Sequence, residues 1–462
     1  MCTEATSIEY RNLRTLGDNA PFARRNHVLG VTAGTVGNVA RDFFHPEMIL
    51  VGMIYALTGS AVYASLVTVI AKAGMLAPQL LAGSLVEHLP RRRPYFIAAT
   101  AGRGIAFAGL ALTIWLLTRG VTALHLGLFY AAFLAVQICT SLGHVVFMDM
   151  IGRLIPAHRV GAFIGMRGFL GGALSLVTGI LVIQPILQGV SMPMNYLVLV
   201  IIGGVLATVD MAIWCQVRER PGARAERRTR LRDAIRRGVH WLRTHRNYRC
   251  YAWARVAFRI NYLGVAFFIP YGTERLGYEK TTGGLALLGG VLVAVFKLCS
   301  VLGSYLWGRV ADRYGSRVTL LRSAQLLLVG VALALLAPAV PQGFSLRVWG
   351  LSQAFTLPLT AYLVALGVFG LALRGTMIGG QRFLITSAPP EHRPSYLAFL
   401  NTLTSPLTLL PVLAAWIAEA AGMVWVFVFV AAGSILGTVA AARMLPDAPQ
   451  AAPGRYSQPS QQ

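Results

Sequence analysis

Four residues that could bind or transfer charge recur at helical spacing in the first long apolar stretch of the chain. Asn38, Arg41, Asp42 and His45 are separated by three, one and three positions, which places them on one face of a helix. Ionisable side chains within a bilayer are costly, so they mark functional positions. Asp42 and His45 can titrate, and we predict that they couple function to protons. Pro46 cannot donate a backbone hydrogen bond and should loosen the helix beside them.

Two lysines occupy equivalent places in two other apolar stretches. Lys72 lies eleven residues before Gly83, and Lys297 lies eleven residues before Gly308. Eleven residues make about three helical turns, so each lysine shares a face with its glycine. These lysines can bind an anion, pair with Asp42, or hold two halves of the protein together. The predicted substrate-binding residues, all polar or cationic groups within apolar stretches, are Asn38, Arg41, Lys72, Arg259, Lys297 and Arg374.

The elements that must position these residues are membrane-spanning helices. Hydrophobic residues make up 56% of the 462 residues, charged residues only 13%, and the mean hydropathy is +0.61. Soluble proteins carry about 25% charged residues. Only helices or closed barrels satisfy their backbones within lipid, and long continuous apolar runs favour helices. The predicted spans, about twelve at roughly 20 residues each, lie near 27–56, 60–86, 95–118, 122–147, 161–184, 194–215, 250–275, 282–306, 318–339, 357–382, 395–418 and 422–444. The first is longer than a bilayer requires, so it should tilt, kink or project.

The net charge of +24 follows the membrane topology rather than marking a nucleic-acid-binding domain. Arginines cluster on one set of connections, which predicts cytoplasmic termini and a cytoplasmic middle loop. Within the basic loop 217–249, Leu231, Ile235, Val239 and Leu242 recur at helical spacing. This pattern favours an amphipathic helix on the anionic inner leaflet, with a partner-binding segment as the alternative. Five scattered cysteines exclude a disulfide framework or a zinc module at the usual spacings.

Two loops of the sequence occur twice. Gly83-Ser-Leu-Val-Glu87 followed by Arg91–Arg93 corresponds to Gly308-Arg-Val-Ala-Asp312-Arg313 followed by Gly315 and Arg317. Similarly, Pro156-Ala-His158-Arg159 corresponds to Pro390-Glu-His392-Arg393. The repetition predicts two similar halves. The predicted divisions are a cytoplasmic N-terminal segment 1–24, a six-helix bundle 25–216, a basic linker 217–249, a second six-helix bundle 250–445 and a disordered tail 446–462.

With these loops, the chain resembles the major facilitator superfamily. The second copy, from Gly308 to Arg317, is similar to the loop signature of that family, whereas in the first copy Glu87 replaces the aspartate and Pro90 the second glycine. The resemblance implies an all-α integral membrane protein with twelve transmembrane helices in two bundles related by a pseudo-twofold axis, which open alternately to each side. It also implies a cytoplasmic gate, for which the candidate residues are Gly83, Glu87, Arg91, Gly308, Asp312, Arg313 and Arg317.

We therefore expect a secondary transporter for a small anionic or zwitterionic solute, coupled to protons and acting as a monomer in the cytoplasmic (inner) membrane. Asp210, within the sixth span, is expected to be structural. Two alternatives stay open: efflux of lipophilic compounds by proton antiport, and a sensor or assembly factor that does not transport. Neither a nucleophile elbow, nor a metalloprotease motif, nor a phosphate-binding loop occurs, so the sequence predicts no enzyme, no cofactor and no metal site.

Overall fold

The computed structural model describes residues 20–76, 78–219, 221, 230–276, 282–341, 345–347 and 354–446. The segment predicted for 1–24 lies largely outside the described residues, as does almost all of the tail 446–462. The first half contains the elements η1 (Ala20–Phe22), α2 (Ala23–Phe43), η2 (Pro46–Leu50), α3 (Val51–Thr58), α4 (Ala61–Leu76), α5 (Gln79–Val86), α6 (Arg93–Arg119), α7 (Ala123–Leu154), η3 (Ala157–Arg159), α8 (Val160–Thr178), η4 (Gly179–Ile183), α9 (Gln184–Gly189) and α10 (Met194–Trp214).

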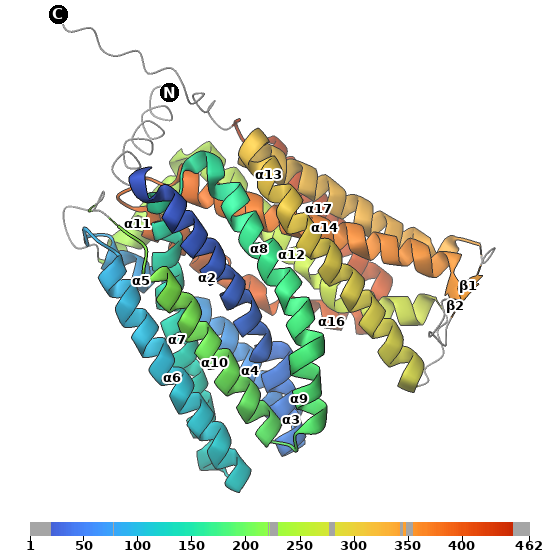
Figure 1. Cartoon of the computed structure of the whole chain (residues 1–462). Helices are drawn as coiled ribbons and strands as arrows, with labels where there is room; N and C mark the ends of the chain where they lie inside the picture. The colour runs from blue at the N-terminus through green and yellow to red at the C-terminus, as the bar shows by residue number, and fades with distance from the viewer. Residues whose placement is uncertain are drawn as a thin grey trace, which may run out of the picture.

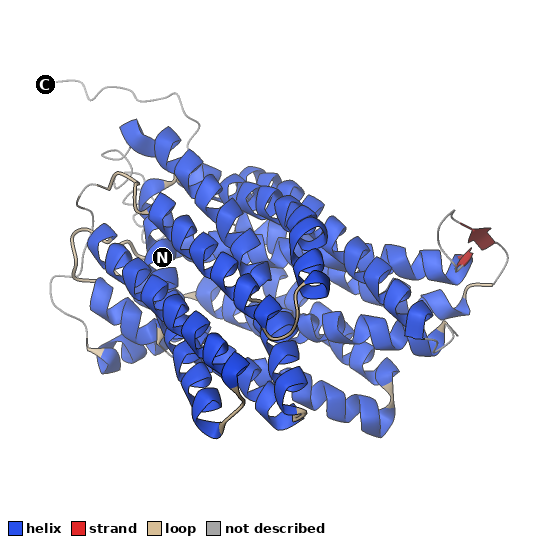
Figure 2. Ribbon diagram, turned by 60° about the horizontal axis from the view of Figure 1, so that its bottom comes forward, coloured by secondary structure: helices blue, strands red, loops and turns tan. Residues whose placement is uncertain are grey.

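The linker contributes α11 (Leu231–Thr244). The second half contains α12 (Arg246–Arg275), α13 (Thr282–Leu336), η5 (Ala337–Ala339), β1 (Ser345–Arg347), β2 (Ala354–Thr356), α14 (Leu357–Ser387), α15 (Arg393–Leu403), η6 (Ser405–Leu409), α16 (Leu410–Ala421) and α17 (Met423–Ala442). Apart from the antiparallel pair β1–β2, in which Leu346 is opposite Phe355, the elements of the described residues are helical (Figure 2).

These elements form twelve membrane-spanning segments, which confirms the predicted fold class. Eight stretches of the described residues are long and apolar enough to cross a membrane, and one of them, Gly290–Ala339, contains two spans. The remaining three segments, α2–α3, α12 and α15–α16, are interrupted or carry more polar residues. Within α13, Gly315 leaves helical geometry with φ 83° and ψ 174°, so the spans on either side reverse direction there.

The first span is broken where its charges lie. Helix α2 ends at Phe43, His45 adopts φ −56° and ψ 119°, and a π-helical turn begins at Pro46. The loosening expected at Pro46 is therefore a complete interruption. Because the helix ends before His45, this residue does not continue the face that carries Asn38 and Arg41.

The two groups of helices lie side by side, with α2–α10 on one side and α12–α17 on the other (Figure 1). Helix α2 packs against α8 and α10, while α12 packs against α17 and α13 against α14. Between the groups, α5 packs against α15 and α8 against α13. Small residues permit the second contact: a Cβ on Gly308 would lie 2.8 Å from the carbonyl oxygen of Gly161. The contacts between the groups lie beside the two repeated loops, Gly83–Arg93 and Gly308–Arg317. We call the end of the molecule that contains these two loops the closed end.

Candidate functional site

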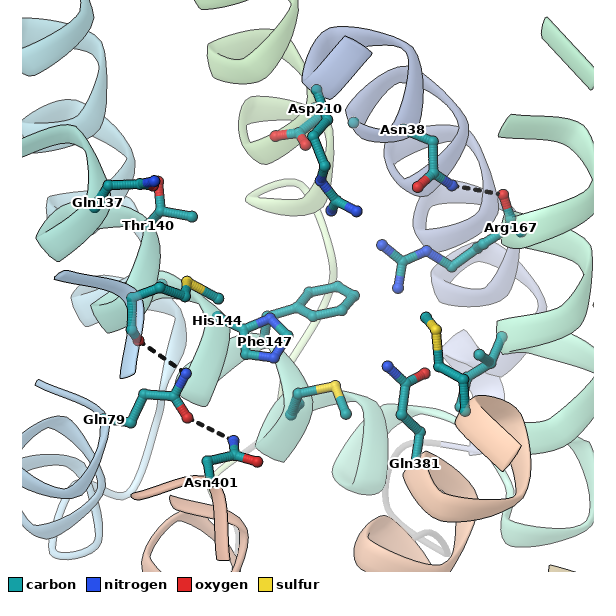
Figure 3. Close-up of a pocket in the computed structure, with 18 of the residues that line it drawn as sticks. Asn38, Gln79, Gln137, Thr140, His144, Phe147, Arg167, Asp210, Gln381 and Asn401 are labelled. Carbon is teal, nitrogen blue, oxygen red and sulfur yellow. Dashed lines mark hydrogen bonds between the residues drawn. The ribbon is translucent and has the colours of Figure 1, made fainter. Parts of the chain in front are cut away.

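A cavity of about 600 Å³ lies between the two groups of helices, and both groups contribute to its walls. This volume is in the range of small-molecule sites. Figure 3 shows Asn38, Arg167 and Asp210 from the first half on one side, and Gln381 and Asn401 from the second half on another. The broken end of α2 brings His45 and Glu47 into the same lining.

The walls of the cavity carry far more positive than negative groups. Among the described residues, the carboxylates that line it are Glu47 and Asp210. The lining cations, which come from seven positions on six helices, are Arg41, Lys72, Arg103, Arg167, Arg255, Arg259 and Arg374. Like charges gathered in a partly dehydrated space repel one another.

Asp210 faces this cationic wall rather than lipid. Its Oδ1 lies 3.7 Å from Nη1 of Arg103, and its side chain fills the space that a Cβ on Gly37 would need. The guanidinium of Arg167 lies 4.4 Å from the ring centroid of Phe147. Asn38 donates a hydrogen bond of 3.0 Å to the backbone oxygen of Arg167 (Figure 3). Asp210, which we expected to be structural, thus lies in the cavity wall.

On the opposite wall, the cations are held by neutral side chains. Arg374 Nε donates to Ser300 Oγ at 2.7 Å. Arg255 donates through Nη2 to Asn401 Oδ1 and through Nε to Thr404 Oγ1 at 3.1 Å. None of these hydroxyl and amide partners carries a charge. The positive charge of this wall is thus oriented but not neutralised by its hydrogen-bond partners.

An amide pair joins the two halves beneath the cavity. Asn401 donates to Gln79 Oε1, while Gln79 Nε2 donates to the Met75 oxygen at 3.0 Å (Figure 3). Gln79 begins α5 and lies four residues before Gly83, so the pair lies about one helical turn from the closed end. It forms a polar floor between α5 and α15.

Each of the two lysines at equivalent places in the sequence, Lys72 and Lys297, forms an ion pair. Lys297 Nζ lies 2.8 Å from Asp42 Oδ2, which links α13 to the end of α2 across the two halves. Lys72 Nζ lies 2.7 Å from Glu47 Oε1, within the first half. Of the alternatives considered for the lysines, Lys297 thus pairs with Asp42. Lys72 has a partner that the sequence did not indicate, because the break at Pro46 redirects Glu47.

The structure brings most of the predicted site residues together. Those that line the cavity are Asn38, Arg41, His45, Lys72, Arg259 and Arg374. Asp42 and Lys297 form their ion pair instead and are not among the lining residues. Sequence reasoning missed Arg103 and Arg255, although both are ionisable groups within apolar runs and the same rule could have found them. It also missed Gln79, Gln137 and Gln381, since a neutral amide in a helix gives a weaker signal.

At the closed end, Asp312 bridges the halves through backbone groups. Its Oδ1 accepts from the Gly161 nitrogen and its Oδ2 from the Ala162 nitrogen, both at 2.7 Å. These nitrogens belong to the first turn of α8, where N–H groups lack partners within the helix and the helix dipole favours negative charge. Arg382 Nε approaches Asp312 Oδ1 at 3.6 Å.

The first copy of the repeated loop makes a different contact. Glu87 Oε2 lies 2.9 Å from Arg237 Nη2 in the linker and 3.3 Å from His392 Nδ1 in the second half. Burial raises the pKa of Glu87, but hydrogen bonds from His392 and Ser395 outweigh it and, with the charge of Arg237, lower the pKa from its ordinary value. A Cβ on the preceding Gly83 would lie 3.0 Å from the Pro394 oxygen, so the halves are also in close contact here.

A fully buried charge cluster adds a third connection. Asp149 lies 2.8 Å from Arg92 Nε, 2.9 Å from Arg153 Nε and 3.5 Å from Arg393 Nη1, which comes from the second half. Burial lowers the pKa of Arg92, against the opposing effect of Asp149. Glu219, just after α10, accepts from the backbone nitrogen of Arg92 at 2.8 Å, and burial raises its pKa.

The other predicted gate residues lie at the edge of this end. Arg317 Nη2 donates to the Ala442 oxygen at 3.1 Å, within the second half. Arg313 is exposed and lies over the ring of Tyr314, with 5.3 Å from its guanidinium carbon to the ring centroid. Arg91 is exposed. The neighbouring Arg92, which was not predicted, is the buried arginine of the first copy.

Comparison with known sequences gives one family and a few relatives. The model described as Major Facilitator Superfamily matches residues 38–365 and 286–461. An uncharacterized protein of Mycobacterium tuberculosis is 26% identical over 310 residues, which cover 66% of this chain and 56% of that protein. An uncharacterized protein of Mycobacterium bovis matches to the same extent. The match thus spans just over half the length of these curated relatives.

Comparison with solved structures gives similar folds at low identity. A bacterial homologue of the iron transporter ferroportin, in an outward-facing state, has a TM-score of 0.67 at 15% identity, covering 91% of this chain and 99% of that one. The proton:xylose symporter XylE has a TM-score of 0.66 at 13% identity, covering 93% and 97%. The human organic anion transporter MFSD10 has a TM-score of 0.65 at 14% identity, covering 91% and 99%. At these identities the likeness concerns the fold.

Proposed function

Since the chain belongs to the major facilitator superfamily, a family of membrane transporters, we propose that it moves a small anionic solute across the membrane by alternating access, coupled to protons. The observation that carries this proposal is the charge of the cavity. Within the described part of the chain, seven lining cations face two lining carboxylates, Glu47 and Asp210. A carboxylate or phosphate between these walls would relieve the repulsion and accept paired hydrogen bonds from the arginines.

The same charge distribution argues against efflux of lipophilic cations. Such a substrate would need an acidic group that is not already surrounded by arginine. Asp210 lies 3.7 Å from Arg103, and Glu47 lies 2.7 Å from Lys72. A cationic solute would therefore compete with the protein's own cations for both carboxylates.

The contacts at the closed end support alternating access. Asp312, Glu87 and Asp149 each join the halves there, while the cavity lies beyond the Gln79–Asn401 floor. On the predicted orientation this end faces the cytoplasm, so the described conformation is closed on its cytoplasmic side. Release of the solute to the cytoplasm would require all three contacts to separate and the floor to part.

Proton coupling is proposed through Asp42, with His45 beside it. The ion pair between Asp42 and Lys297 joins the halves, and both side chains remain partly accessible, at 23% and 38%. Protonation of Asp42 would remove the attraction and free the Lys297 ammonium for the solute. This mechanism links uptake of a proton to a cross-bundle contact that alternating access must rearrange.

The substrate proposal can be tested with purified protein in sealed proteoliposomes. We expect accumulation of small carboxylates or phosphates, but not of neutral sugars of equal size. Arg259→Gln and Arg374→Gln should each raise the solute concentration needed for half-maximal transport by roughly tenfold to a hundredfold. This is the increase expected for loss of a hydrogen bond to a charged group, which contributes about 1.5–3 kcal/mol. The matched control is Arg322→Gln, an exposed arginine outside the cavity that bonds to Gln325. Equal transport of neutral solutes, or unchanged half-saturation in both cavity variants, would contradict an anion site.

The proton proposal has its own variant. Asp42→Asn should abolish accumulation driven by an imposed pH gradient while exchange of labelled for unlabelled solute continues. His45→Gln, measured in parallel, shows whether the neighbouring histidine shares the role. If Asp42→Asn accumulates solute as well as the parent protein does, Asp42 is not the coupling residue.

A further inference from the structure

Helix α11 in the linker has one face that is fixed to the protein. Ala234 and Trp241 are buried, and Gly238 packs so closely against the ring of Phe399 in α15 that a side chain there would clash. The ring of Trp241 lies 5.2 Å from that of Tyr396, also in α15. One face of α11 is thereby attached to the second half of the transporter.

A neighbouring position on α11 reaches the first half. Arg237 Nη2 lies 2.9 Å from Oε2 of Glu87, directly after α5. Since Glu87 also contacts His392 of the second half, α11 lies across the junction that holds the closed end together. Figure 1 shows α11 beside α5 at this end of the molecule.

A second apolar strip on the same helix faces outward. Leu231, Ile235 and Val239 follow one another at four-residue intervals, with exposures of 39%, 42% and 37%. At 100° per residue, this strip lies next to the exposed side chains of Arg232, Arg236 and Arg243. An exposed apolar strip bordered by arginines is typical of a helix lying at the surface of an anionic membrane.

We propose that α11 lies in the headgroup region of the cytoplasmic leaflet, binds anionic phospholipid through these arginines, and thereby holds the closed end shut. The occupant of the strip is inferred from charge complementarity and from the attachment of α11 to a protein that itself spans the bilayer. The membrane contact depends on the predicted orientation. The effect on the closed end rests additionally on the proposed alternating access, so the two are tested separately.

The membrane contact can be tested in full-length protein in lipid nanodiscs. An environment-sensitive fluorophore is attached to Ile235→Cys, or to His240→Cys on the opposite side of α11, after the five native cysteines have been replaced by serine. In nanodiscs rich in phosphatidylglycerol, we expect lipid-borne spin labels to quench Ile235→Cys at least threefold more than His240→Cys. Aqueous iodide should show the reverse preference.

The arginines are tested in the same assay. In the parent protein, lipid-borne spin labels should quench the fluorophore at Ile235→Cys more in phosphatidylglycerol than in phosphatidylcholine nanodiscs. The combined variant Arg232→Gln, Arg236→Gln and Arg243→Gln should remove this difference in quenching, whereas Arg322→Gln should preserve it. Equal iodide quenching at both label positions in both lipids would overturn the proposal and show that the strip faces water. Protection from iodide that appears only with an added acidic protein, and not with anionic lipid, would assign the strip to a protein partner and equally overturn it.

The effect on the closed end is read from the distance between spin labels at His158 and Arg443, exposed positions in the two halves at this end. Phosphatidylglycerol should narrow the distance distribution towards the shorter, closed form. Arg237→Gln should abolish this response while fluorophore quenching at Ile235→Cys stays intact, because it removes the link to Glu87 and leaves the lipid-facing side unchanged. A lipid response that survives Arg237→Gln would refute the coupling but not the membrane contact.

Discussion

Replacing Asp312 by asparagine should destabilise the form in which the two halves meet at the closed end. The effect should be larger than that of neutralising an exposed carboxylate. Asp312 accepts two backbone hydrogen bonds of 2.7 Å from Gly161 and Ala162, and its side chain is only 14% exposed. Asparagine has a single acceptor oxygen, so one N–H group of α8 would face an amide group that is itself a donor.

The cost can be estimated from these contacts. Loss of the charge at the start of α8 removes about 0.3–2 kcal/mol. Loss of one hydrogen bond to a charged acceptor removes about 1.5–3 kcal/mol. Together they suggest about 2–5 kcal/mol, which corresponds to a shift of roughly 30-fold to 4,000-fold in the equilibrium between closed and separated forms. If the closed form begins at about 99%, the lower estimate leaves about three-quarters of the molecules closed.

The assay is double electron–electron resonance between spin labels at His158 and Arg443 in nanodiscs. We expect Asp312→Asn to add a longer-distance population that is minor in the parent protein. Glu274→Gln serves as the control, because Glu274 is an exposed acid at the end of α12 that lies away from the closed end. Superimposable distributions for Asp312→Asn and the parent protein would refute the reasoning that backbone capture by Asp312 holds the halves together.

Three further predictions concern the two copies of the loop and the lysines. Gly308→Ala should open the same end, since its Cβ would lie 2.8 Å from the Gly161 oxygen and overpacking costs about 1–3 kcal/mol; the same spin-label distances measure it, and an unchanged distribution would show that α8 and α13 can adjust. The pKa of Glu87 is lowered from its ordinary value of 4.5, so its stabilising contribution should be complete above that pH and lost as pH falls through the lowered value. The difference in melting temperature between parent protein and Glu87→Gln should therefore be constant near neutrality and shrink below about pH 4.5; a difference that grows on acidification would reverse the assigned direction. Lys72→Ala and Lys297→Ala should each reduce transport in vesicles without reducing membrane insertion, and normal transport in both would remove them from the site.

Much of the architecture could be predicted because the membrane constrains it so strongly. Continuous apolar runs, arginine-rich connections and a repeated glycine-acid-arginine loop indicate twelve helices in two halves, with no need for side-chain detail. The interruption of the helix at Phe44–His45 was harder to predict from the sequence. Pro46 signals a missing hydrogen bond, but whether a helix bends or breaks depends on packing against neighbours, and only the structure shows that Glu47 turns towards Lys72.

Part of the cavity lining could be predicted from one rule, that an ionisable side chain within an apolar run marks a functional position. This rule selected Arg41, Arg259 and Arg374, all of which line the cavity. It could not supply pairings, because Asp42 and Lys297 are 255 residues apart and meet only through packing between the halves. The rule did not identify Asp210 as a residue of the cavity, because we expected it to be structural.

The two copies of the loop differ because one residue fixes how each can turn. Gly315 adopts φ 83°, a conformation that favours glycine, and the corresponding residue of the first copy is Pro90, whose ring holds φ near −65°. The first copy cannot reproduce the turn of the second. In the second copy Arg317 stays near the surface and bonds to a carbonyl of its own half, whereas its counterpart Arg92 is fully buried against Asp149. An isolated arginine there would be prohibitively costly, which explains why Asp149 and Glu219 accompany it and why Arg393 can enter the same cluster from the other half. The departure of the first copy from the family pattern therefore does not weaken its side of the closed end, but transfers the contact from a backbone-capturing acid to a buried network of charges.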